Sequence, residues 1–451
     1  MSTRPSLSAS LSTPWPVTAH WGEEGLEIGG IPVTSLADSH GTPLLVIDEE
    51  HLRRRSGDFR EAFPQVMYAV KALTSRRLLQ LVACEGLQVL AASGGELDAS
   101  LRAGIAPTHI ALHGNNKTDA ELRHAIRAGI ALLICDHLEE IERANAIAER
   151  LGVRQDVLLR VIPEVVAGGH RFITTGDSDS KFGLSMGSGQ ARVAVERVVA
   201  SRGLRFRGLH AHIGSQILSP EPYLTTIDTL AAFAGHLERY VGVSSDVFDL
   251  GGGFGITYVD EDPVDVHLLA GDLLDRLSSA CRRRGIGVPC LIVEPGRAIV
   301  GNAGVTLYRV GAVKQDGHGA RIVAVDGGMS DNVRPMLYGA RYAVAPAAPA
   351  RRSESIPVKV VGKHCESGDI LADGVEVPAS LGSGDVLVVA ATGAYCYSMA
   401  STYNRTPRPA VVAVRQRRAE VWLRRETYDD LDRLEPHDER EEEEARVSLR
   451  R

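Results

Sequence analysis

The sequence predicts an α/β protein built from a TIM-type (β/α)₈ barrel and a second, mostly β domain. Short apolar runs alternate with helix-like segments such as Asp119–Ala128 and Leu138–Arg150. Such alternation is typical of a parallel sheet covered by helices, and eight runs can close a barrel. The runs are Val66–Ala72, Leu87–Ala92, His109–His113, Ile130–Cys135, Val157–Ile162, Gly208–Ile213, Val247–Leu250 and Cys290–Val293.

Clusters of polar or small residues follow most of these runs. Barrel enzymes carry their chemistry at the C-terminal ends of the strands, so we expect these clusters to meet at one mouth. They are Lys71, Ser93–Glu96, His113–Asn116, His212, Gly251–Gly253 and Glu294–Arg297.

The domains follow in order along the chain. Residues 1–20 are rich in Ser, Thr and Pro and are predicted to be disordered. Residues 21–45 alternate and turn like a small hairpin, and we assign them to the β domain. The barrel is expected over residues 46–300. Beyond it the helical patterns stop, and β-rich runs predict the β domain over residues 301–430. Residues 431–451 are a charged tail, which is typical of a solvated end.

Composition excludes several classes of protein. The formal net charge of −7 argues against a nucleic-acid-binding surface. No apolar stretch approaches the ~18 residues of a membrane span, and the N-terminus does not resemble a secretory signal. Six cysteines show no Cys-x-x-Cys pair and no zinc-site spacing. We therefore expect a cytoplasmic enzyme with reduced thiols, no metal, and neither a membrane nor a nucleic-acid partner.

Lys71 ends an otherwise apolar strand. A buried free ammonium group is costly, so the side chain either reaches the rim of the barrel or forms a Schiff base.

A glycine run follows the seventh predicted barrel strand, and a carboxylate follows the eighth. Successive glycines at Gly251–Gly253 let backbone N–H groups converge on a phosphate, and barrels commonly bind phosphate there. No dinucleotide fingerprint is present. Glu294 needs a cation, either Arg297 or a protonated ring nitrogen. Lysine, phosphate loop and carboxylate together match pyridoxal 5′-phosphate, and His212 is placed to stack on its ring.

Three further clusters occur in the predicted β domain. As isolated loops they would be turns, but their Cys, Glu, Arg and Tyr residues suit the binding of a dicarboxylic amino acid. The clusters are Asp326–Asp331 with Arg334 and Tyr338, Lys363–Asp369, and Gly393–Tyr397.

These motifs resemble those of the pyridoxal-phosphate-dependent amino-acid decarboxylases with the alanine-racemase-like fold, and within them the diaminopimelate decarboxylases. The resemblance covers roughly residues 25–430, and two of its motifs, GKHCESGD and ATGAYCYSMAS, resemble the actinobacterial forms. The motifs are YAVKA, SGGEL, HGNNK, KFG, HAHIGSQI, GGGFG, EPGR, DGGMSDNVRP, GKHCESGD and ATGAYCYSMAS.

The resemblance implies roles around the cofactor. Lys71 would carry pyridoxal phosphate as a Schiff base, Glu294 would pair with the pyridinium nitrogen, and His212 would stack on the ring. The phosphate would be held by Ser215 and by the backbone of Gly252, Gly253, Gly296 and Arg297.

The resemblance also implies roles around the substrate. Arg297, Arg334 and Tyr338 would bind its far carboxylate. Glu366 would bind its distal ammonium group, and Tyr395 would touch both cofactor and substrate.

Cys365 would protonate the carbanion left when CO₂ departs. In this family Cys365 and Glu366 enter the barrel mouth of the partner subunit, which implies an obligate homodimer with shared active sites. The implied reaction converts meso-diaminopimelate to L-lysine by loss of the carboxylate at the D-centre.

Two motifs depart from the family pattern. Leu90 stands where an aspartate is usual, and the HTHEFI motif appears as Gly168–Ile173, with Gly168 and Arg171 changed. These changes leave open a related decarboxylase for D-lysine, D-ornithine or a carboxylated amine precursor. An amino-acid racemase of the same fold and a non-catalytic pyridoxal-phosphate-binding protein also stay open.

Overall fold

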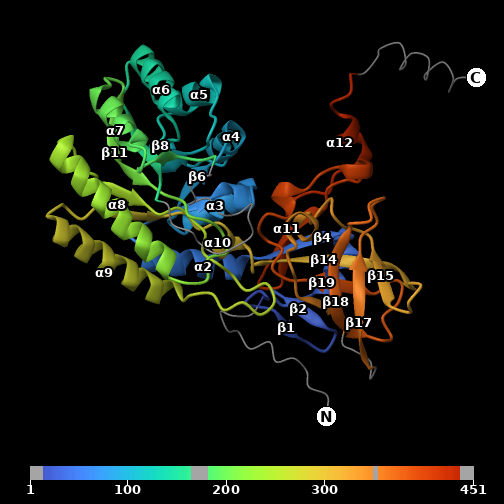
Figure 1. The fold of residues 1–451 in the computed structure, drawn as a ribbon. Helices are drawn as coiled ribbons and strands as arrows, with labels where there is room; N and C mark the ends of the chain where they lie inside the picture. Colours follow the sequence, from blue (N-terminus) through green and yellow to red (C-terminus); the bar gives the residue numbers. More distant parts are fainter. Residues whose placement is uncertain (1–13, 164–180, 349–353, 437–451) are drawn as a thin grey trace, which may run out of the picture.

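The computed structural model describes residues 14–163, 181–348 and 354–436 (Figure 1). A barrel with its surrounding helices lies beside a domain of strands. The chain crosses from the domain of strands into the barrel before the first barrel strand, and it returns after the last one. None of the helices in the described ranges is long and apolar enough to cross a lipid bilayer.

Eight parallel strands form the predicted barrel. Each strand pairs with the next, and pairing of β13 with β5 and of β8 with β9 closes the sheet. Apolar side chains from alternating positions, including Met67, Leu90 and Ile292, fill the interior. The strands are β5 (Gln65–Ala69), β6 (Gln88–Ala91), β7 (Ile110–Leu112), β8 (Leu132–Cys135), β9 (Gln155–Ile162), β11 (Leu204–His210), β12 (Val247–Asp249) and β13 (Cys290–Val293).

The helices around the barrel follow local signals in the sequence. The helix α5 (Asp119–Ala128) begins with a capping box between Thr118 and Glu121 and ends at Gly129 in the left-handed conformation. The other helices are α2 (Glu49–Ala62), α3 (Arg76–Cys84), α4 (Gly94–Arg102), α6 (Leu138–Leu151), α7 (Gln190–Ala200), α8 (Glu221–Tyr240) and α9 (Val266–Arg284), and the two-residue strand β10 (Leu184–Ser185) pairs with β9.

The β domain is organised around one long strand, β14 (Gly304–Gln315). Its first half pairs with β4 (Leu44–Asp48) and β19 (Val386–Val389), and its second half pairs with β15 (Arg321–Val325). The remaining strands are β16 (Val344–Pro346), β17 (Ser355–Val361), β18 (Ile370–Pro378), β20 (Ala410–Arg415) and β21 (Arg418–Leu423).

The N-terminal segment packs on this β domain. Its three short strands β1 (His20–Trp21), β2 (Leu26–Ile28) and β3 (Ile31–Pro32), together with α1 (Val33–His40), share an apolar core with β4, β14 and β20. The strand β4 continues three residues beyond the predicted boundary at residue 45.

The prediction that residues 1–20 are disordered is wrong for residues 14–20. Thr18 Oγ1 donates to Asp48 Oδ2 at 2.8 Å, and Ala19 is buried. These contacts are made to distant residues, so local composition does not reveal them. Residues 1–13 lie outside the described part.

The predicted charged tail begins with structure. The short helix α12 (Tyr428–Asp432) has a capping box between Thr427 and Asp430, and Arg405 pairs with Asp432 and with Glu435. The run Glu441–Glu444 lies outside the described residues.

The two domains meet at the end of β5. The carbonyl oxygen of Ala72 accepts hydrogen bonds from the Tyr395 amide and from Ser398 Oγ, both at 2.8 Å. The β-domain loop 391–401 is thereby fixed against the barrel mouth. Two short helices flank the junction, α10 (Arg297–Val300) from the barrel and α11 (Arg334–Tyr338) from the β domain (Figure 1).

Candidate active site

Lys71 lies at the C-terminal end of the first barrel strand. The strand β5 ends at Ala69, and residues Val70–Ala72 form a 3₁₀ turn rather than the predicted continuation of the strand. The Ala72 carbonyl is occupied by donors from the β domain, so it cannot extend the barrel ladder. The turn places Lys71, half-buried, on the wall of a cavity.

That cavity has a volume of about 250 Å³ and brings together most of the predicted site residues. Segments at the ends of the barrel strands supply most of its lining, and the β domain supplies the rest. Its lining contains Lys71, His212, Ser215, Gly252, Gly253, Glu294, Gly296, Arg297, Arg334, Tyr338 and Tyr395.

Glu294, which lines the cavity, belongs to a buried cluster with Asp249 and His210. Glu294 Oε1 lies 3.3 Å from His210 Nε2. Burial opposes ionisation of Glu294, but the charge of His210 outweighs the effect of burial and holds the pKa of Glu294 below its usual range. Burial, reinforced by the neighbouring Glu294, raises the pKa of Asp249 well above its usual range. Glu294 is therefore the more acidic of the two carboxyl groups.

His210, Asp249 and Glu294 bring their ligand atoms within 4.8 Å of one another. Of the three, Glu294 lines the same cavity as Lys71, so it can meet a cationic group of a bound ligand, such as a protonated ring nitrogen.

The glycine run is required by close approach of backbone segments. A Cβ atom on Gly252 would lie 2.4 Å from the carbonyl oxygen of Glu294. Gly253 has φ +97°, and its Cβ would lie 2.6 Å from the Gly214 carbonyl oxygen. The Gly252 amide donates to His212 Nδ1 at 3.1 Å, which fixes the orientation of that ring. Burial lowers the pKa of His212 well below its usual range, so the ring is neutral and suited to stacking.

Two arginines also line the cavity. Arg297 and Arg334 are 8% and 7% exposed. Arg297 Nη2 donates to Ser215 Oγ at 2.8 Å, and its guanidinium group lies 4.8 Å from the centre of the Tyr395 ring. Arg334 Nη1 donates to the hydroxyl groups of Tyr258 and Tyr342. Within the described ranges neither arginine forms an ion pair. Two buried cations without a counter-ion favour an anionic ligand.

Cys365 and Glu366 do not line the cavity of their own chain. Both are exposed, on a loop that is firmly held at its base. The carboxylate of Asp369 accepts the amides of Met329 and His364, and His364 Nε2 lies 2.8 Å from Ser330 Oγ.

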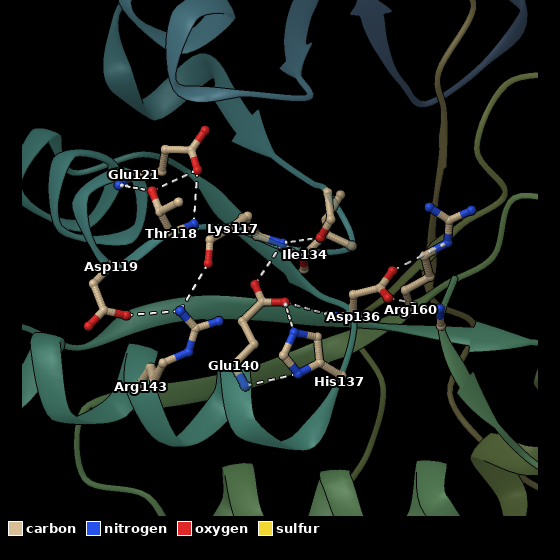
Figure 2. A network of polar contacts seen from close by, with 12 residues as sticks. Lys117, Thr118, Asp119, Glu121, Ile134, Asp136, His137, Glu140, Arg143 and Arg160 are labelled. Atoms are coloured by element: carbon tan, nitrogen blue, oxygen red, sulfur yellow. Dashed lines mark hydrogen bonds and ion pairs between the residues drawn. The ribbon is translucent and has the colours of Figure 1, made fainter. Parts of the chain in front are cut away.

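The HGNNK motif has a structural role (Figure 2). Lys117 Nζ lies 2.6 Å from Glu140 Oε1, and it donates to the carbonyls of Gly114 and Ile134. Both members of this ion pair are buried, with 3% and 0% of their side chains exposed. The pair holds the loop after β7 against the strand β8 and the first turn of α6.

An adjacent carboxylate orders the KFG motif. Asp136 lies beside Arg160 (Figure 2), and its Oδ2 accepts the Gly183 amide at 3.0 Å. The guanidinium group of Arg160 lies 4.3 Å from the centre of the Phe182 ring. Arg160 comes from β9 and links this network to the wall of the barrel. The altered motif with Gly168 and Arg171 lies outside the described residues, and Leu90 belongs to the apolar barrel interior.

The comparisons with known proteins agree with this geometry. Residues 49–301 match the family described as pyridoxal-dependent decarboxylase, pyridoxal binding domain. Over 444 residues the chain is 44% identical to the diaminopimelate decarboxylase of Mycobacterium tuberculosis, covering 93% of this chain and 97% of that protein. The chain belongs to the diaminopimelate decarboxylase family.

Other members show the same relationship. The diaminopimelate decarboxylase of Bacillus subtilis is 40% identical over 417 residues, with 91% of this chain and 95% of that protein covered. The crystal structure of the M. jannaschii diaminopimelate decarboxylase in complex with L-lysine is 30% identical, with a TM-score of 0.88, and covers 93% of this chain and 98% of that chain. The Helicobacter pylori enzyme complexed with L-lysine is 31% identical, with a TM-score of 0.82, and covers 89% of this chain and 99% of that chain.

The cofactor of this family is pyridoxal phosphate, as the sequence predicts, and the cavity fits it. Its lining combines a lysine, a carboxylate, glycines and a serine. Glu294 borders this space and is held in its ionised form beside His210, so it can also stabilise a protonated ring nitrogen.

Sequence reasoning missed several residues of the site. Asp249, His210, Tyr258 and Tyr342 are all buried next to predicted residues. Asp249 and His210 could have been found, because both occupy the last position of a barrel strand. The roles of Tyr258 and Tyr342 depend on contacts between the two domains.

Proposed function

We infer that this chain removes the carboxylate at the D-centre of meso-diaminopimelate and so forms L-lysine and CO₂. The observation that carries this conclusion is a single cavity lined both by Lys71 and by two arginines that have no counter-ion among the described residues. A substrate with an amino acid centre at each end matches both groups.

The cofactor supplies the electron sink for the bond that breaks. Lys71 is the residue that would hold it covalently, and Glu294 would keep its ring nitrogen protonated. The neutral ring of His212 would support one face. Ser215 and the backbone of Gly252, Gly253, Gly296 and Arg297 would hold the phosphate.

Arg297, Arg334 and Tyr338 would bind the far carboxylate. Anchoring that end fixes which centre of the substrate faces Lys71, and orientation of this kind is a large part of enzymatic rate enhancement. Tyr395 lies over Arg297 and would contact both cofactor and substrate.

The site would be completed by a second copy of the chain. Cys365 and Glu366 are exposed on a rigid loop and do not line their own cavity. In a symmetric homodimer this loop would enter the partner's mouth. Glu366 would then bind the distal ammonium group, and Cys365 would transfer its thiol proton to the carbon that has lost CO₂.

Substrate comparison tests the proposed function. Purified holoenzyme is incubated with meso-diaminopimelate, D-lysine or D-ornithine, and CO₂ and amine products are measured. We expect CO₂ and L-lysine from meso-diaminopimelate at a rate far above that from the other two. Faster release from D-lysine or D-ornithine would assign the chain to a related decarboxylase, and exchange of the α-proton without CO₂ would assign a racemase.

A further inference from the structure

Tyr258 is a buried residue that the roles above do not use. It lies on the loop after the glycine run, and its backbone is fixed from both sides. The Tyr258 amide donates to Glu261 Oε2 at 2.7 Å, and its carbonyl oxygen accepts the Ala343 amide at 3.1 Å. Its side chain is therefore held in one place at the junction of barrel and β domain.

The hydroxyl group of Tyr258 joins the two arginines of the cavity. It accepts a hydrogen bond from Nη1 of Arg297, and another from Nη1 of Arg334 at 2.7 Å. Arg297 belongs to the barrel helix α10, and Arg334 belongs to α11 of the β domain. A single oxygen atom therefore sets the spacing of two cations that come from different domains.

The tyrosine hydroxyl aligns these cations as a shared hydrogen-bond acceptor. Neither arginine forms an ion pair within the described ranges, so both positive charges stay available to an anion. Like charges held together repel each other, and a shared acceptor offsets part of that repulsion. Tyr342 differs, because its hydroxyl accepts from Arg334 but contacts Cys396 on its other side.

We propose that Tyr258 is a positioning residue that couples Arg297 and Arg334 into one site for the far carboxylate of the ligand. The inference rests on the proposed function and deepens it. The preference of the enzyme for substrates with a carboxylate at both ends depends on this hydroxyl group.

The test uses binding of two ligands to the holoenzyme, measured by titration calorimetry. L-lysine keeps the far carboxylate of the substrate, and cadaverine lacks it. In Tyr258→Phe we expect the Kd for L-lysine to rise roughly tenfold, as loss of a hydrogen bond to a charged group implies, and the Kd for cadaverine to change less than about twofold. In steady-state assays KM for meso-diaminopimelate should rise while kcat stays within about twofold.

Tyr342→Phe is the matched control, because it removes the same atom from a tyrosine that contacts only one of the arginines. Its effect on L-lysine binding should be clearly smaller. Combining Tyr258→Phe with Arg334→Ala should add little to Arg334→Ala alone, since the coupled partner is already gone. Unchanged thermal unfolding would show that the variants are folded, and if Tyr258→Phe is destabilised, the same measurements are made on it and on the wild type at a lower temperature, where it is folded.

These outcomes distinguish a failure of the proposed function from a failure of the role of Tyr258. A wild-type enzyme that binds L-lysine no better than cadaverine would overturn the proposed function. A wild-type enzyme that prefers L-lysine, with the same preference in Tyr258→Phe, would overturn the role of Tyr258 alone. Equal losses in Tyr258→Phe and Tyr342→Phe would also contradict it.

Discussion

Lys71 is the residue on which the chemistry depends, because it is the lysine that lines the cavity with Glu294. Borohydride reduction of the holoenzyme followed by peptide mapping should place the pyridoxyl group on Lys71, and Lys71→Ala should lose the yellow colour of the bound cofactor. Lys181 is exposed in the neighbouring KFG motif, so Lys181→Ala is the control that should keep the label. A pyridoxyl group on any other lysine would contradict the assignment.

Arg334 should discriminate between substrates. It is buried without an acidic partner from the described residues, so a carboxylate placed against it gains a desolvated ion pair. Arg334→Ala should cost about 2–5 kcal/mol of transition-state stabilisation with meso-diaminopimelate, measured from kcat/KM. The loss should be much smaller with D-lysine, which lacks the second carboxylate. Equal losses on both substrates would make Arg334 a structural residue.

Site residues at strand ends could be predicted from the sequence, whereas Tyr258, which joins the two arginines, could not. Lys71 and Glu294 each end an apolar run, and the (β/α)₈ architecture brings such ends together. Tyr258 has no distinguishing pattern, since its partner Arg334 lies in another domain. The exposure of Cys365 also required the structure.

The ion pair between the loop after β7 and the helix α6 should contribute strongly to stability. Lys117→Met would leave Glu140 as a buried, unpaired charge, which should cost about 3–5 kcal/mol. Urea denaturation followed by circular dichroism measures the change. Adding Glu140→Leu should restore most of the loss, because the uncompensated charge is then removed.

The exposed pair between Asp98 and Arg102 of α4 is a suitable control. Its side chains are 48% and 73% exposed, so Arg102→Ala should change stability by no more than about 1 kcal/mol. A Lys117→Met variant as stable as Arg102→Ala would show that the buried pair does not hold the loop.

At the level of elements, the regular barrel was more predictable than the segments around it. The strands β5 to β13 combine apolar runs with helices between them, and α5 has strong caps at both ends. The helix α1 contains Thr, Ser and Asp, which favour helices weakly. It is stabilised by burial of Leu36 in the β domain, a contact that local sequence does not encode.

At the level of the whole molecule, the position of Cys365 and Glu366 predicts complementation between subunits. Lys71→Ala and Cys365→Ala homodimers should each be nearly inactive. After dissociation and mixing, about half of the dimers should be hybrids with one intact site, so about a quarter of wild-type activity should return. No recovery, with subunit exchange confirmed by a mass-tagged chain, would rule out shared sites.

The proposed function requires that this chain break one bond of one substrate, the bond between the D-centre of meso-diaminopimelate and its carboxylate. The most direct measurement uses meso-diaminopimelate carrying ¹³C in the carboxyl group of its D-centre. We predict that the label appears entirely in CO₂, that the L-lysine formed is unlabelled, and that Lys71→Ala releases neither product. Label retained in the amine product, or CO₂ release that persists in Lys71→Ala, would contradict the account.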